Sequence, residues 1–181
     1  DLAVFVGPAL VALALVAAAP ALGLAGADTP GWAWIAGILL VDVGHVWSTA
    51  LVTYLDGSEL RRRPLLYPTV PILGWLAGVA VYATSGPAGF WRALAYLAIF
   101  HFVRQQYGWV ALYRARAGDR DRLGLWIDSA MIYAATLYPL VWWHCASPRA
   151  FSWFVEGDLV IGGPAALATA AGVVYLVIIA A

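Results

Sequence analysis

The chain alternates long apolar stretches with short polar breaks, and this pattern predicts a bundle of membrane-spanning helices. A helix needs about 20 mostly apolar residues to cross the hydrocarbon core of a bilayer. Proline, glycine and polar residues separate the apolar stretches, which is typical of short loops between helices. The predicted spanning helices cover six segments, at about residues 2–25, 31–55, 65–84, 88–112, 124–144 and 159–181.

Composition supports a membrane fold. Hydrophobic residues make up 64% of the 181 residues, and charged residues make up 11%. Ordinary soluble domains are about 45–50% apolar and about 25% charged. We therefore predict an all-α, polytopic transmembrane helix bundle that forms one domain over residues 1–181. The chain starts with aspartate and ends in apolar residues without a charged anchor, so we expect it to be part of a longer protein.

The arginines predict an orientation in the membrane. Residues 56–64 and 113–123 hold most of them, whereas the loops on the opposite side offer only Arg149. Loops that stay in the cytoplasm carry an excess of positive residues. We therefore predict a multi-pass protein of a bacterial-type inner membrane, with both arginine-rich loops and the N-terminus in the cytoplasm.

Charge and residue types exclude several functions. The formal net charge is zero, so composition gives no basis for nucleic-acid binding. The chain has no lysine, which excludes a retinal-type Schiff base within it. The single cysteine, Cys145, excludes an internal disulfide and a cysteine-based metal centre. The expected partners are the lipid bilayer, a lipophilic small molecule and possible further membrane subunits.

Helix 31–55 carries a polar stripe in an apolar surrounding. Asp42, His45, Thr49 and Thr53 lie three or four residues apart, so they share one face of the helix. His45 is about ten residues from the predicted cytoplasmic end. At about 1.5 Å per residue this places it roughly 15 Å deep, near the bilayer midplane.

Helix 88–112 carries a second polar group at the same depth. By the same rise, His101 lies roughly 16 Å from the cytoplasmic end, with Arg104 and Gln105 one turn further along. Charges inside a bilayer cost several kcal/mol unless they are paired. Asp42 and Arg104 are therefore expected to pair with each other or with a ligand. A polar clamp that only pins the two helices is the structural alternative.

Two further ionisable residues belong to helix 124–144. His144 lies at its outer end, roughly 15 Å above the two other histidines, so we place it at the outer interface. Pro139 is a candidate break in this helix. Asp128 lies near the inner end and is expected to face the arginine-rich loop.

Two imidazoles at one depth and a nearby carboxylate are typical ligands of non-haem iron. We predict that His45, His101 and Asp42 bind the metal. Asp42 alternatively accepts a hydrogen bond that orients His45. Arg104 and Gln105 are the candidate catalytic residues, and Gln105 could also be a weak ligand or a donor to bound oxygen.

At these residues the chain resembles the Brp/Blh-type membrane β-carotene dioxygenases. The resemblance rests on His45, on His101 with the adjacent Phe102, on the interval between the two histidines, and on the polar residue and glycine that follow. It covers the second to the fourth predicted helix. It implies a polytopic membrane enzyme that holds iron through histidines on several helices and oxidises a lipophilic substrate.

The function predicted from the sequence is an integral-membrane, metal-dependent oxygenase or hydroxylase that acts on a lipophilic substrate. Two alternatives stay open. His45 and His101 could be the axial ligands of a haem b in a redox-complex subunit, which could also be purely structural. Asp42, His45 and Arg104 could form a proton relay or transport path without metal.

Overall fold

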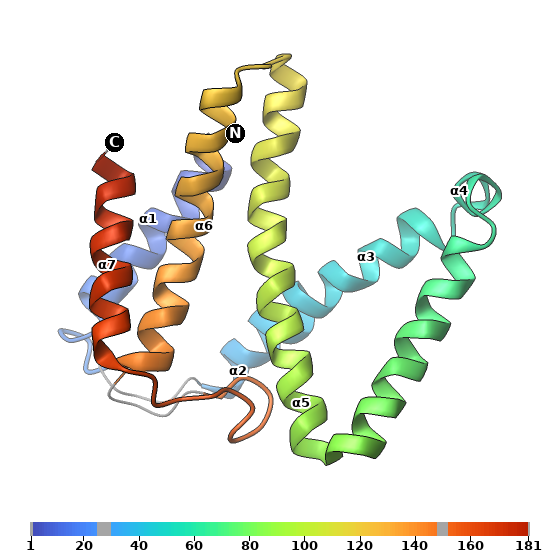
Figure 1. Ribbon diagram of the computed structural model, residues 1–181, viewed down its shortest axis with the longest axis horizontal. Helices are drawn as coiled ribbons and strands as arrows, with labels where there is room; N and C mark the ends of the chain where they lie inside the picture. The colour runs from blue at the N-terminus through green and yellow to red at the C-terminus, as the bar shows by residue number, and fades with distance from the viewer. Residues whose placement is uncertain (1, 25–29, 148–151, 181) are drawn as a thin grey trace. The chain divides into compact units, whose positions relative to one another are not determined.

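The computed structural model describes residues 2–24, 30–147 and 152–180, and in these ranges the chain is helical and has no strands. It divides into two compact units, Asp1–Val70 and Pro71–Ala181. The positions of these units relative to one another are not determined (Figure 1).

The first unit begins with α1, Leu2–Ala18, and continues with a helical segment at Gly31–Thr53. That segment consists of α2 (Gly31–Trp34), the π-helix η1 (Ile35–Val43) and α3 (Gly44–Thr53). It agrees with the predicted helix at 31–55. The polar residues of the predicted stripe fall on η1 and α3.

A short helix, α4 (Gly57–Arg62), completes the first unit together with the start of α5. The Asp56 carboxylate caps it by accepting hydrogen bonds from the Ser58 hydroxyl at 2.6 Å and the Ser58 backbone N–H at 2.8 Å. These bonds lower the pKa of Asp56, because they stabilise its charged form. The Tyr67 hydroxyl donates a hydrogen bond of 2.9 Å to the Glu59 carboxylate. The Tyr67 backbone oxygen accepts one of 3.1 Å from the Tyr54 hydroxyl.

The second unit is built on α5, Leu66–Ala117, which bends sharply at Gly86 (Figure 1). Gly86 has φ 70° and ψ −178°, a backbone conformation that glycine adopts at little cost. Pro87 follows and suits the first turn of a new helix, because it has no N–H to satisfy. The bend coincides with the predicted break at residues 85–87 and divides α5 into arms at 66–85 and 87–117.

Two further helices complete this unit: α6, Arg122–Cys145, and α7, Ala165–Ala180. Pro139 does not interrupt α6. α7 packs closely against α6. The Tyr138 and Tyr175 rings stack with centroids 5.1 Å apart, and Gly172 leaves room for Tyr138, since a Cβ there would lie 3.2 Å from its ring.

The prediction of six spanning helices is wrong. Within the described ranges, two helices are long and apolar enough to cross a membrane by length and composition, namely Gly31–Thr53 and Leu66–Ala117. The predicted helices at 65–84 and 88–112 are the two arms of the single element α5. α6 has sufficient length, with 24 residues, but its sequence is too polar to pass the same test.

The two terminal helices are shorter than predicted. α1 has 17 residues and ends at Ala18, because Pro20 cannot continue the helical hydrogen bonds. α7 has 16 residues and starts at Ala165, although the sequence pattern placed its start at 159. Residues 159–164 instead form a loop that contains Gly162 and Gly163 and ends at Pro164.

Candidate functional site: the space between α5 and α6

The second arm of α5 and α6 run in opposite directions beside each other (Figure 1). Large side chains bridge them at three levels of the described structure. One level lies at the turn between the helices, one near the middle of α6 and one near its end. Because long side chains bridge the gap, the two backbones stay apart, unlike those of α6 and α7, and space remains between the levels. The bridging pairs are, in order, Arg114 with Asp128, Tyr107 with Tyr133, and Tyr96 with His144.

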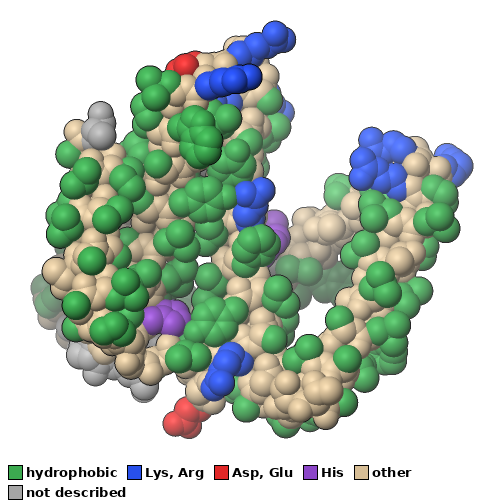
Figure 2. All heavy atoms as spheres, in the orientation of Figure 1, with side chains coloured by type: hydrophobic (Ala, Val, Ile, Leu, Met, Phe, Trp, Pro, Cys, Tyr) green, Lys and Arg blue, Asp and Glu red, His purple; other side chains and the backbone are tan. Residues whose placement is uncertain are grey.

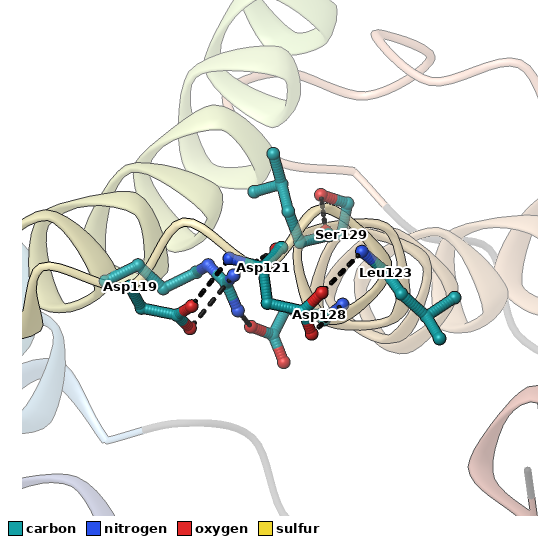
Figure 3. A network of polar contacts seen from close by, with 8 residues as sticks. Asp119, Asp121, Leu123, Asp128 and Ser129 are labelled. Atoms are coloured by element: carbon teal, nitrogen blue, oxygen red, sulfur yellow. Dashed lines mark hydrogen bonds and ion pairs between the residues drawn. The ribbon is translucent and has the colours of Figure 1, made fainter.

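At the turn, ion pairs join α5 to α6 (Figure 3). The Arg114 guanidinium ion-pairs with Asp128 at 2.7 Å and with Asp119 at 2.9 Å. It also donates to the backbone oxygen of Asp121 at 2.6 Å. Asp128 therefore faces the arginine-rich loop, as predicted from the sequence.

Aromatic rings and a cation form the middle level. The Tyr107 and Tyr133 rings stack with centroids 5.8 Å apart. Arg104 donates a hydrogen bond of 2.6 Å to the Tyr133 hydroxyl, and its guanidinium carbon lies 5.0 Å from the centre of the Tyr107 ring. The two tyrosines thus fix the position of the cation by a hydrogen bond and a cation–π contact.

A histidine with a defined tautomer forms the third level. His144 Nδ1 lies 2.7 Å from the Leu140 backbone oxygen, which can only accept, so Nδ1 carries the proton of the neutral ring. Nε2 then accepts the hydrogen bond of 2.9 Å from the Tyr96 hydroxyl. The same hydroxyl oxygen accepts from the Val160 N–H at 3.1 Å. His144 therefore joins α5, α6 and the loop before α7, and its expected position at the outer interface stays a prediction.

The described part of that loop, residues 152–164, is organised by the Asp158 carboxylate, which is fully buried. It accepts backbone hydrogen bonds from Trp153 at 3.1 Å, Phe154 at 2.6 Å and Val155 at 3.1 Å. Burial alone would raise the pKa of Asp158. The three N–H groups outweigh burial and hold the pKa below its usual value.

Aromatic contacts fasten this loop to α5. Trp153 stacks on Phe102 with centroids 5.6 Å apart, and Phe154 lies 5.5 Å from Trp91. Arg92 adds a hydrogen bond of 2.9 Å to the Gly157 backbone oxygen.

An open cavity of about 560 Å³ lies between the middle and third levels, and the loop lines one side of it. Several of its lining side chains, among them Ala135 and Trp143, are exposed. Its lining is mostly apolar, and only three lining side chains bring an amide or a hydroxyl. The Thr136 hydroxyl already donates to the backbone oxygen of Ile132 at 2.8 Å. Besides the polar Gln106, Thr136 and Ser152, the lining residues are Ile99, Phe102, Val103, Ala135, Pro139, Leu140, Trp143 and Trp153.

The residues of the predicted iron site fall in different units. Asp42 lies in η1 and His45 in α3, while His101 lies in α5. Because the two units are not placed relative to one another, the shared site stays a prediction, and the Asp42 side chain lies outside the described residues. No group of three or more His, Cys, Asp or Glu side chains that could hold a metal occurs in the described part of the chain.

The candidate catalytic pair occupies neighbouring positions of α5. Arg104 is exposed and Gln105 half-buried, and neither lines the cavity of 560 Å³. Of this pair, Arg104 lines a separate groove on α5 and α6. The catalytic roles of both residues stay predictions.

Sequence reasoning missed the residues that build the cavity. Ala135, Thr136 and Trp153 come from positions without a motif, and Gln106 directly follows Gln105, which the sequence had indicated instead. One signal was present, because Ser152-Trp153-Phe154 is an aromatic run in a loop. Buried aromatic side chains dominate packing energy, so such a run favours docking onto a helix.

Comparison of the chain with protein-family models, with curated proteins and with solved structures gave no match. The resemblance to the Brp/Blh-type dioxygenases therefore stays a prediction from the residues alone.

Proposed function

We propose that this protein is embedded in a lipid bilayer and binds a neutral lipophilic molecule in the cavity between α5, α6 and the loop 152–164. The observation that carries the proposal is the cavity itself. Its volume of about 560 Å³ lies within the range of roughly 300–1,000 Å³ for small-molecule sites, which are also mostly apolar.

The exposure of α5 supports a membrane environment. A core helix of a soluble protein is mostly buried, but in α5 the buried residues are only Ala95 and Val103. Large exposed apolar patches mark contact with lipid or with partners. Hydrophobic side chains are spread along all the helices in Figure 2, and cationic ones gather around the turn between α5 and α6.

The lining of the cavity favours a neutral ligand. It contains no charged side chain, and its polar side-chain groups are one amide, two hydroxyls and the indole N–H groups of Trp143 and Trp153. The Thr136 hydroxyl hydrogen is used within α6, so the candidate donors to a ligand include Gln106, Ser152 and the Trp153 indole. A few polar groups in an apolar pocket fix a ligand's orientation, while the apolar contacts supply the affinity.

The proposal is tested by photolabelling in phosphatidylcholine nanodiscs with an alkyl chain that carries a diazirine. Labelled residues are mapped by mass spectrometry. We expect label enriched on residues of the cavity in the wild-type protein and lost in Ala135→Trp, which fills the cavity. The control is Ala130→Trp on the same helix, because Ala130 is exposed and does not line the cavity. Label spread evenly over the lipid-facing residues, or unchanged in Ala135→Trp, contradicts the proposal.

The chemistry predicted from the sequence is a separate question with its own test. Stoichiometric iron without a strong visible band supports the oxygenase, and a Soret band supports haem b. His45→Ala and His101→Ala should each abolish metal binding if the two histidines share a site, while His144→Ala should not. Full metal occupancy in both of the first two variants contradicts a shared site.

A further inference from the structure

Arg104 is a cation in a short polar segment, residues 101–106, of the otherwise apolar arm of α5. It lies ten residues before Arg114, which corresponds to about 15 Å along the helix. Arg114 has two carboxylate partners, whereas no carboxylate ion-pairs with Arg104 among the described side chains. A charge at such a position is costly unless an opposite charge is brought to it.

The Arg104 guanidinium is held in a fixed position by contacts that use only some of its N–H groups. One of its N–H groups donates to the Tyr133 hydroxyl, and the Tyr107 ring lies against it. Guanidinium has five N–H groups in a planar fork, so one edge stays available for a bidentate contact. Because the Tyr133 oxygen accepts from Arg104, its own O–H is directed elsewhere and can donate to the same ligand.

A groove of about 570 Å³ adjoins these donors. Its walls are mainly apolar and come from one face of α5 and one of α6. The Tyr96 hydroxyl, also in the groove, donates to His144 and is not available. The apolar walls are Ile99, Phe100, Val103 and Leu137.

We propose that this groove binds a long-chain fatty acid, with the carboxylate on Arg104 and Tyr133 and the alkyl chain along the apolar walls. The carboxylate matches the site in charge, and its two oxygens match the free guanidinium edge and the Tyr133 O–H. A phosphate would leave a further oxygen without a donor among the described residues. Charge and an apolar groove together select an amphiphile rather than a small anion.

The groove differs from the cavity of 560 Å³, although Ile99 and Val103 contribute to the walls of both. Ala135 lines only the cavity, and Arg104 and Tyr133 line only the groove. Ala135→Trp therefore separates the two proposals, because it fills the cavity and leaves the groove open.

The test measures radiolabelled oleate binding to the protein in phosphatidylcholine nanodiscs, corrected with empty nanodiscs. Arg104→Gln should weaken binding about tenfold or more, since it removes a charge-assisted bidentate contact. Tyr133→Phe keeps the ring stack and removes only the hydroxyl, so a loss of about threefold to tenfold is expected. Arg116→Gln is the control, an exposed arginine of the same helix outside the groove. Ala135→Trp should bind oleate as the wild type does.

Competitors identify the chemistry that is recognised. Unlabelled oleate should compete, whereas methyl oleate and inorganic phosphate should not. Equal competition by methyl oleate overturns the proposal in favour of apolar partitioning, and competition by phosphate overturns it in favour of a small-anion site. Unchanged oleate binding in Arg104→Gln, or equal losses in Arg104→Gln and Arg116→Gln, also overturns it. Loss of oleate binding in Ala135→Trp would show that the groove is not a separate site.

Discussion

Different kinds of polar interaction hold the two ends of the α5–α6 pair together. At the turn, Arg114 holds Asp119 and Asp128, whose side chains are 38% and 39% exposed. At the other end, the fully buried Asp158 is satisfied by three backbone N–H groups, and Tyr96 links His144 to Val160. One end therefore relies on ion pairs to two partly exposed carboxylates, and the other mainly on the hydrogen bonds of one fully buried carboxylate.

The difference shows how much one polar contact contributes at each end. Exposed ion pairs are worth about 0–1 kcal/mol and weaken in salt, because solvent screens them. A buried donor or acceptor left without a partner costs about 1–3 kcal/mol. Single substitutions should therefore disturb the loop end much more than the turn.

The largest effect is expected for Asp158→Asn. Asparagine lacks the negative charge on which the three N–H groups converge, and its NH₂ would face the Trp153 N–H, which donates to both carboxylate oxygens. The free energy of unfolding should therefore fall by roughly 2–3 kcal/mol. Limited proteolysis of residues 152–164 and the midpoint of thermal unfolding measure this. Proteolysis at the wild-type rate would contradict the role of Asp158.

The same carboxylate predicts a pH dependence. The pKa of Asp158 is lower in the folded protein than in the unfolded chain, where it is about 3.9. Its contribution is thus complete above about pH 4 and is lost as the pH falls through the lower folded value. Acid should loosen the wild-type loop, and Asp158→Asn should remove this loop's sensitivity to acid.

Gly163→Ala should destabilise the loop end by about 1–3 kcal/mol. The new Cβ would lie 2.5 Å from the Cys145 sulfur, so something must shift. Cys145→Ala removes the clash, and the double variant should recover most of the lost stability. Additive losses in this double-mutant cycle would show that the two residues do not interact.

Tyr96→Phe should cost about 1 kcal/mol, because it removes the hydrogen bonds to the half-buried His144 ring and to the exposed Val160 N–H. Tyr175→Phe is the matched control, since the contact found for Tyr175 is the ring stack on Tyr138. Thermal unfolding of both variants gives the comparison, and equal shifts would argue against the Tyr96 hydrogen bonds.

The smallest effect is expected for Asp128→Asn at the turn, less than about 1 kcal/mol and smaller still in high salt. Thermal unfolding at low and high ionic strength measures it. A loss of unfolding free energy as large as that of Asp158→Asn, and independent of salt, would contradict the proposed difference between the two ends.

Local pattern predicted much of the helical structure. α6 was expected at 124–144 and runs from Arg122 to Cys145, and the break at Gly86 was expected from its sequence. Apolar composition did not reveal where a run stops being helical, so the loop at 159–164 was taken as helix. Glycine and proline there outweigh the apolar character of Leu159, Val160 and Ile161.

The site was harder to predict, because its contacts join residues far apart in the sequence. Helical spacing showed that His101 and Arg104 lie near each other on α5, but not that Arg104 meets Tyr133. No local rule connects Tyr96 with His144 or the Val160 N–H. The predicted link between His45 and His101 is of the same long-range kind and stays open.

The tyrosines between α5 and α6 act as spacers whose length sets the width of the interior. Leucine or alanine in place of Tyr107 or Tyr133 would let the helices approach and would narrow both the cavity and the groove. Ligand size could therefore change during evolution through single exchanges at these positions, with the helices, turn and loop retained.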